Sequence, residues 1–266
     1  MTKPNGIISL ITDFGYHDEY VGVMKGAILR TCPETRIVDI CHEIPPHDVV
    51  RASRMLAASY PYFPSGTIHL IVVDPGVGLD RHILVLEAAG HLFIAPDNGI
   101  LTPLLSSSRL SGCYRLIIST KTTSSCTFHG RDIMAPAAAR LAAGMTPRKL
   151  ATAIPAEECA TIIMPSARIE DDCLIGEVVA IDHFGNIATS IGKEHLFSMR
   201  DSVEVCLGET VIRNIHATFG EVAAGFPVAL INSRGDLEIG INMGNAAVIL
   251  NCRVGDKVVV RSCKPS

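Results

Sequence analysis

Four short apolar segments of this chain each end at an aspartate, and this pattern limits the fold more than any other feature. The clearest is residues 71–81, where Ile-Val-Val is followed by Asp74, a proline, two glycines and Arg81. Apolar runs of this kind are typical of strands buried on both faces, and ligands of open α/β sheets bind beyond the carboxyl ends of such strands. One Asp-Pro-Gly alone is more typical of a solvated turn. The four aspartates predict a site along one edge of a largely parallel sheet; they are Asp13, Asp39, Asp74 and Asp97.

Helical patterns separate these strands. Residues 19–30 carry apolar side chains at helical spacing, and Pro33 ends the element. Asp48 stands where it can cap a helix that follows it. An alanine-rich helix is predicted over residues 133–143, with His129 just before it, where unpaired backbone N–H groups favour anions. We therefore predict an α/β domain with flanking helices over residues 1–165.

The pattern changes after about residue 145. Three prolines and an acidic patch at 170–172 interrupt the periodicity and indicate a domain boundary. Beyond it lie seven short candidate strands, at 174–181, 187–191, 203–207, 210–212, 228–231, 237–241 and 257–261. Short strands at this spacing predict a small β barrel or sandwich over residues 172–266.

Composition excludes several classes of protein. The net charge of −4 provides no cationic field for nucleic acid, and no apolar run approaches the roughly 20 residues that span a bilayer. The nine cysteines are scattered and odd in number, which argues against a disulfide framework and for a reducing compartment. The N-terminus shows no signal-peptide pattern. We expect a cytoplasmic protein whose partner is a small molecule, with no nucleic acid and no membrane.

The residues alone leave the chemistry open. Acids at strand ends commonly bind ribose hydroxyls, and a glycine-rich phosphate loop is missing, so a nucleoside without phosphates fits better than ATP or NAD. One possibility is a metal-dependent nucleoside hydrolase that uses Asp13, Asp18 and Asp39 as oxygen ligands. A second is metal-free displacement, in which an Asp, an Arg and a His position a water. A third is a nucleoside-binding sensor without turnover. Spacing does not separate them.

Six blocks taken together resemble the S-adenosylmethionine hydroxide adenosyltransferases, the hydrolase relatives of the fluorinating and chlorinating enzymes. The blocks are residues 12–15, 39–48, 74–78 with Arg81, 95–99, 127–132 and 182–186, and the match runs from about residue 7 to the C-terminus. The resemblance implies an N-terminal α/β domain and a C-terminal β barrel. It also implies a homotrimer with each active site between the N-terminal domain of one subunit and the C-terminal domain of the next.

The resemblance implies hydrolysis of S-adenosyl-L-methionine to adenosine and L-methionine by attack at the ribose C5′, without metal or cofactor. The catalytic residues it implies are Asp74, Arg81 and His129. The halogenating relatives carry a Tyr and a Thr where this chain has Asp74 and Val77, and they lack the histidine. The present residues therefore favour water over halide as the nucleophile.

The remaining matches are to substrate-binding positions. Asp13 matches the ribose acid, His47 stands where relatives often place an aromatic, and Thr127 and Phe128 match positions beside the sugar and base. In the second domain, Asp182 matches the position that holds the methionine ammonium, Phe184 and Asn186 match those that contact adenine, and Ser233 and Arg234 match those that bind the methionine carboxylate. Asp236 departs from the pattern, because relatives usually have Tyr there.

Overall fold

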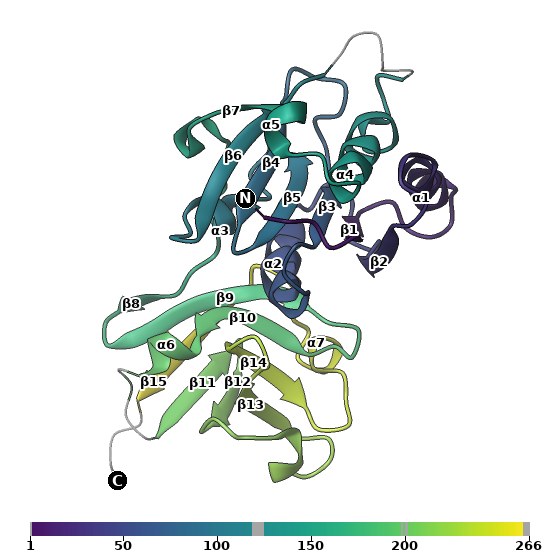
Figure 1. Cartoon of the computed structure of the whole chain (residues 1–266). Helices are drawn as coiled ribbons and strands as arrows, with labels where there is room; N and C mark the ends of the chain where they lie inside the picture. The colour runs from purple at the N-terminus through teal and green to yellow at the C-terminus, as the bar shows by residue number, and fades with distance from the viewer. Residues whose placement is uncertain (1, 119–124, 198, 200–201, 263–266) are drawn as a thin grey trace. The chain divides into compact units, whose positions relative to one another are not determined.

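The computed structural model describes the chain except residues 1, 119–124, 198, 200–201 and 263–266 (Figure 1). The chain divides into two compact units, residues 1–162 and 163–266. Each is described by itself. No helix in the described part of the chain is long and apolar enough to cross a membrane.

The first unit is built on a seven-stranded sheet in the order β2-β1-β3-β5-β4-β6-β7. Its strands are β1 (Ile7–Thr12), β2 (Arg36–Cys41), β3 (Ile68–Val72), β4 (Ile83–Ala88), β5 (His91–Pro96), β6 (Leu110–Leu116) and β7 (Ala151–Ala153). The first four strands in that order run parallel, and β4, β6 and β7 pair antiparallel. The predicted α/β class is confirmed, but the sheet is mixed. The cause is the two-residue hairpin Ala89-Gly90, whose residues both have positive φ and turn the chain straight back from β4 into β5.

Helices cover both faces of this sheet. Met24 and Ile28 of α1 (Tyr20–Thr31) and Leu141 of α4 (Ala135–Ala142) belong to the core on one face, while Leu56 of α2 (Val49–Ser59) belongs to the core on the other. Asp48 caps α2 as predicted, accepting a hydrogen bond from the Arg51 N–H at 2.8 Å. A π-helical turn, η2 (Gly130–Met134), leads into α4. The remaining short helices are α3 (Thr102–Leu105), α5 (Pro147–Leu150), η1 (Tyr60–Tyr62) and η3 (Ala156–Glu158).

Three of the four aspartates follow strands that run side by side in the same direction. Asp13, Asp74 and Asp97 come after β1, β3 and β5, so they lie beyond the same edge of the sheet. The prediction was wrong for Asp39, which lies inside β2 opposite Leu10. This strand is at the edge of the sheet, where a charged side chain remains accessible within the strand, so the acid did not mark its end.

The second unit is an antiparallel, nearly closed barrel, which confirms the predicted β barrel. All seven predicted strands are present: β9 (Cys173–Ile181), β10 (Ile187–Gly192), β11 (Val203–Leu207), β12 (Thr210–Arg213), β13 (Pro227–Ile231), β14 (Asp236–Ile241) and β15 (Lys257–Ser262). An eighth, β8 (Arg168–Glu170), pairs with β9 and was not predicted. The order is β12-β11-β15-β9-β10-β14-β13, and a bridge from His216 to Leu230 brings the two ends together.

Alternation along β14 decides which of its side chains can bind a ligand. Leu237, Ile239 and Ile241 belong to the barrel core, so Asp236, Glu238 and Gly240 lie on the opposite face. Short helices follow β10, β12 and β14; they are α6 (Lys193–Leu196), η4 (Phe219–Glu221) and α7 (Ala246–Ile249).

Candidate active site

A cavity of about 280 Å³ lies in the first unit beyond the ends of β1 and β3 and beside the start of η2. It brings together six of the residues singled out from the sequence: Asp13, His47, Asp74, Thr127, Phe128 and His129. Phe14 and Tyr20 also line it, and their rings pack against Phe128 with centroids 5.6 and 5.4 Å apart. Neither ring was predicted as a site residue, although Phe14 lies within the block at residues 12–15.

Arg81 forms a charged pair with Asp74 at the cavity wall. The Arg81 Nε lies 3.0 Å from both carboxylate oxygens, and Nη2 also contacts Oδ2. Both side chains are more than nine-tenths buried. Asp74 lines the cavity, whereas Arg81 is not among the lining residues. Arg81 therefore acts on the cavity through the groups that it holds.

The loop that carries this pair depends on Gly78. Its φ is +78°, a conformation that other residues rarely adopt, and a Cβ at this position would meet the Cys126 carbonyl oxygen at 2.7 Å. The missing side chain lets residues 74–81 pack against the segment that leads into Thr127 and His129. This close approach brings together groups that are far apart in the sequence.

His129 completes the cluster. Its Nδ1 lies 2.9 Å from Nη2 of Arg81. A guanidinium only donates hydrogen bonds, so Nδ1 is the acceptor and the neutral imidazole carries its proton on Nε2. Burial lowers the pKa of His129 below its ordinary value and Arg81 lowers it further, against smaller opposing effects of Asp74 and Asp132. His129 is therefore a neutral ring with an N–H available to donate.

Asp13 is held by a backbone N–H group of another loop. Its Oδ2 accepts a hydrogen bond from the His47 N–H at 3.0 Å. His47 has a φ of +69°, in the left-handed region that is unfavourable for a residue with a side chain. The two prolines before it hold a rigid loop, and this local strain places both side chains at the cavity.

A chain of polar contacts, partly exposed at Lys25 and Asp39 and buried at His42, leads to Thr12. Lys25 Nζ contacts Oδ2 of Asp39 at 2.5 Å, Oδ1 of Asp39 lies 3.1 Å from His42 Nε2, and His42 Nδ1 lies 2.7 Å from the Thr12 hydroxyl. A carboxylate only accepts, so Nε2–H faces Asp39 and the Thr12 hydroxyl donates to Nδ1. Burial raises the pKa of Asp39, but the hydrogen bonds from Lys25 and His42 outweigh it and hold the pKa below its ordinary value. The chain fixes Thr12, the residue next to Asp13.

The metal-ligand set considered from the sequence is not gathered in the structure. Among the described residues, no group of three or more His, Cys, Asp or Glu side chains is placed to hold a metal ion. Asp39 contacts Lys25 and His42, and Asp13 accepts from the His47 backbone.

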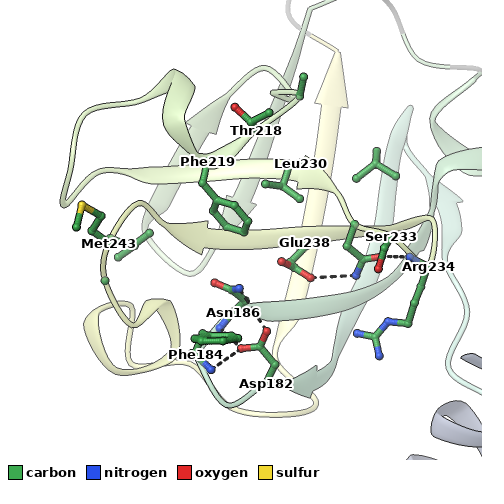
Figure 2. A pocket seen from close by; sticks show the side chains of 15 residues that line it. Asp182, Phe184, Asn186, Thr218, Phe219, Leu230, Ser233, Arg234, Glu238 and Met243 are labelled. Atoms are coloured by element: carbon green, nitrogen blue, oxygen red, sulfur yellow. Dashed lines mark hydrogen bonds between the residues drawn. The ribbon is translucent and has the colours of Figure 1, made fainter. Parts of the chain in front are cut away.

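The second unit contains a larger pocket of about 1070 Å³, lined by residues of β13 and β14, the turn between them and the turn before β10 (Figure 2). It brings together all five residues singled out there: Asp182, Phe184, Asn186, Ser233 and Arg234. Oδ1 of Asp182 accepts the Phe184 and Asn186 N–H groups at 2.9 Å, and Oδ2 lies 3.3 Å from the Asn186 amide. Asp182 therefore holds its own turn together.

Two further residues of this pocket were not predicted. Glu238 lines it with 9% of its surface exposed and accepts a hydrogen bond from the Asn232 amide at 3.0 Å. The ring of Phe219 packs so closely over Gly240 that a Cβ there would meet it at 2.5 Å. A glutamate between two apolar strand residues is typical of a solvent-facing position, so the sequence held no signal for its burial.

The fold and the two cavities define the class of protein: an α/β unit followed by a β barrel, with a cavity in each. The chain belongs to the SAM hydroxide adenosyltransferase family: the N-terminal domain model of that family matches residues 8–151 and the C-terminal domain model matches residues 176–259. The resemblance drawn from the sequence blocks is confirmed.

Similarity to individual proteins extends over nearly the whole chain. A (R)-S-adenosyl-L-methionine hydrolase from Salinispora tropica is 38% identical over 265 residues, which cover 97% of this chain and 98% of that protein. A fluorinase from Actinopolyspora mzabensis is 28% identical over 291 residues, covering 96% of each. The crystal structure of an uncharacterized conserved protein from Thermotoga maritima aligns with a TM-score of 0.87 and 33% identity, over 96% of this chain and 99% of that one.

Proposed function

We propose that this protein hydrolyses S-adenosyl-L-methionine to adenosine and L-methionine, and that its substrate is the (R) sulfonium epimer named for the Salinispora tropica relative. The observation that carries the proposal is the cluster of Asp74, Arg81 and His129 at the wall of a cavity in a member of this family. These three residues are the proposed catalytic group.

The protonation states support a division of labour among the three. Neutral His129 donates from Nε2 to the oxygen of the water and orients it. Asp74 accepts a hydrogen bond from the same water and takes up its proton, because Nδ1 of His129 already accepts from Arg81. Arg81 is the positioning residue that fixes both groups.

The proposed reaction is a displacement at the ribose C5′. The water oxygen forms a bond to C5′ while the C5′–S bond breaks, and the electron pair of that bond goes to sulfur to give the neutral thioether of methionine. One water proton stays on the new 5′ hydroxyl and the other passes to Asp74. A positive sulfonium is already an activated leaving group, which is why we propose that the reaction needs no metal and no cofactor.

Substrate contacts are proposed for both units. In the first, Asp13 binds the ribose hydroxyls and His47, Thr127 and Phe128 enclose the sugar and base; all four line the cavity with Asp74. In the second, Phe184 and Asn186 contact adenine, while Asp182, Ser233 and Arg234 face the charged groups of methionine. Their shared pocket supports this assignment. Residues 1–165 then form the catalytic domain and residues 172–266 complete the site.

Water is the proposed nucleophile because a charged acid and an imidazole stand at the wall of the cavity. Asp74 would repel an approaching halide ion, while it can accept the proton of a water. Val77 lines the same cavity and offers no hydroxyl to a halide. Chloride or fluoride should therefore not replace water in the product.

We also propose a homotrimer in which the N-terminal unit of one subunit and the C-terminal unit of the next complete each site. That each unit carries one half of the proposed substrate contacts supports this arrangement. Light scattering on the purified protein tests the trimer.

A cytoplasmic location is proposed because eight cysteines among the described residues are free thiols, as is typical of a reducing compartment.

The test of the activity uses chelator-treated protein and separated (R) and (S) epimers of S-adenosyl-L-methionine. The account predicts equal amounts of adenosine and methionine from the (R) epimer, formed at the same rate with and without EDTA. Turnover that stops with EDTA and returns with a divalent metal would favour a metal-dependent hydrolase. Bound substrate without any product would indicate a sensor.

A further inference from the structure

We propose that Glu238 binds the α-ammonium group of the methionine half of the substrate. The pocket therefore prefers ligands that carry this group. The inference deepens the proposed function and depends on it. Glu238 was not among the residues singled out from the sequence, and it is placed by the fold on the pocket face of β14.

The Asp182 carboxylate accepts hydrogen bonds from residues of its own turn. One of its oxygens accepts two backbone N–H groups and the other faces the Asn186 amide. This leaves mainly Oδ2 of Asp182 for a ligand, whereas an ammonium group has three N–H donors to satisfy. The pocket therefore needs a second carboxylate to bind an ammonium group well.

Glu238 is a buried carboxylate at the wall of this pocket. Its side chain is nine-tenths buried and lines the pocket, and one carboxylate oxygen, Oε2, accepts from Asn232. The structure shows no hydrogen bond from the described residues to Oε1. A buried carboxylate oxygen is unfavourable without a donor, and the pocket is where a donor can reach it. Figure 2 shows the carboxyl group among the side chains that surround the pocket.

The surroundings of Glu238 disfavour its negative charge. Burial raises the pKa of Glu238, and the negative charge of Asp182 raises it further, while Arg234 and the Asn232 hydrogen bond act in the opposite direction. A ligand cation between Asp182 and Glu238 would remove this repulsion. The ammonium group of an amino acid carries that charge at neutral pH.

The same pocket also contains groups that can bind a carboxylate. Ser233 and Arg234 occupy the turn between β13 and β14, and both line the same pocket. Arg234 is 3.8 Å from Asp236 and keeps other guanidinium N–H groups for a ligand carboxylate. Arg234 on the turn can bind the carboxylate of an amino acid, and Glu238 on the adjoining strand β14 can bind its ammonium group.

The experiment measures binding of methionine, adenosine and 4-(methylthio)butanoate, which lacks the ammonium group, to the full chain by calorimetry. Wild-type protein should bind methionine at least tenfold more tightly than the deaminated analogue, because the analogue cannot make the charged hydrogen bond; tenfold corresponds to about 1.4 kcal/mol. The Glu238→Gln variant should bind methionine about tenfold or more weakly, bind adenosine as tightly as wild-type protein does, and bind methionine and the deaminated analogue equally. Glu209→Gln, at an exposed turn of the same barrel, is the matched control.

Every other outcome overturns the proposal. Equal binding of methionine and the deaminated analogue by wild-type protein does so without reference to any variant. Weaker adenosine binding by Glu238→Gln, with methionine unchanged, would make Glu238 a purine contact. Failure of wild-type protein to bind methionine would also overturn it. Product formation from S-adenosyl-L-methionine in the same preparation would still leave the proposed function standing.

Discussion

Arg81 donates a hydrogen bond to Nδ1 of His129 across 2.9 Å, and this contact fixes the proton of the neutral imidazole on Nε2. The same guanidinium holds Asp74 through both carboxylate oxygens. One buried cation therefore orients both Asp74 and His129 at the cavity, and the choice of Asp74 as the proton acceptor in the proposed mechanism follows from this arrangement.

The first prediction concerns the pH dependence of His129. Its pKa is lowered by burial and then by Arg81, so the neutral form that orients water should persist below the ordinary value of about 6.5. Activity should fall only as the pH drops through that lowered pKa. In Arg81→Gln the positive neighbour is removed and the pKa should rise, which NMR titration of the His129 ring measures independently of turnover. An unchanged or lower pKa in this variant would contradict the account.

The second prediction concerns Asp74. Asp74→Asn keeps the shape of the side chain but removes its capacity to take up a proton, so kcat should fall by about 100- to 10,000-fold. Substrate binding, measured by calorimetry, should change little. Asp80→Asn, an exposed position on the same loop, serves as the control and should retain full activity. Unchanged turnover in Asp74→Asn would remove this residue from the catalytic group.

The third prediction concerns the buried contact between Thr12 and His42, next to Asp13. Thr12→Val deletes the hydroxyl that donates to His42 and leaves a buried acceptor without its partner, which costs about 1–3 kcal/mol in the free energy of unfolding. Because Thr12 adjoins the proposed ribose acid, KM should rise more than kcat falls. Thr12→Ser keeps the hydroxyl and should restore KM. Equal KM values for the two variants would show that this contact does not position Asp13.

The fourth prediction concerns stability in acid. His69 is fully buried in the first unit, where its Nδ1 lies 2.6 Å from the Ser9 hydroxyl and its ring stacks on Phe93. Burial and, to a smaller extent, the neighbouring His91 together lower the pKa of His69 to about 3. The unfolded chain binds this proton more readily, so the neutral ring stabilises the fold above about pH 6.5 and this contribution is lost as the pH falls toward 3.

Denaturant unfolding at a series of pH values tests that prediction. The wild-type free energy of unfolding should decline between pH 6.5 and 4, and His69→Gln, which hydrogen-bonds but does not titrate there, should show a shallower decline. His17→Gln, at an exposed position, should follow the wild-type curve. Identical slopes for His69→Gln and wild-type protein would refute the assignment.

The parts of the fold that depend on local pattern were predictable. Apolar runs located the strands of both units except the three-residue strands β7 and β8, and Asp48 marked the start of α2. The direction of β4 was not predictable from its own residues, because it is set by the hairpin at Ala89-Gly90 and by pairing with β6. Asp39 was misplaced for a similar reason, since the end of a strand depends on its partner strand.

The candidate site divides in the same way. Residues in compact sequence blocks, such as Asp74 and Asn186, could be singled out because the family pattern is local. Glu238 could not, because its burial comes from the turn carrying Asn232 and from the segment around Phe219, both of which pack over β14 in space. The hydrogen bond that determines the His129 tautomer likewise joins residues from different elements.

The most direct test of the central claim is incubation of chelator-treated protein with (R)-S-adenosyl-L-methionine in ¹⁸O-labelled water, followed by mass analysis of both products. The account predicts one labelled oxygen in the 5′ hydroxyl of adenosine and none in methionine. Free adenine or any other product without label at the 5′ position would contradict displacement by water at C5′.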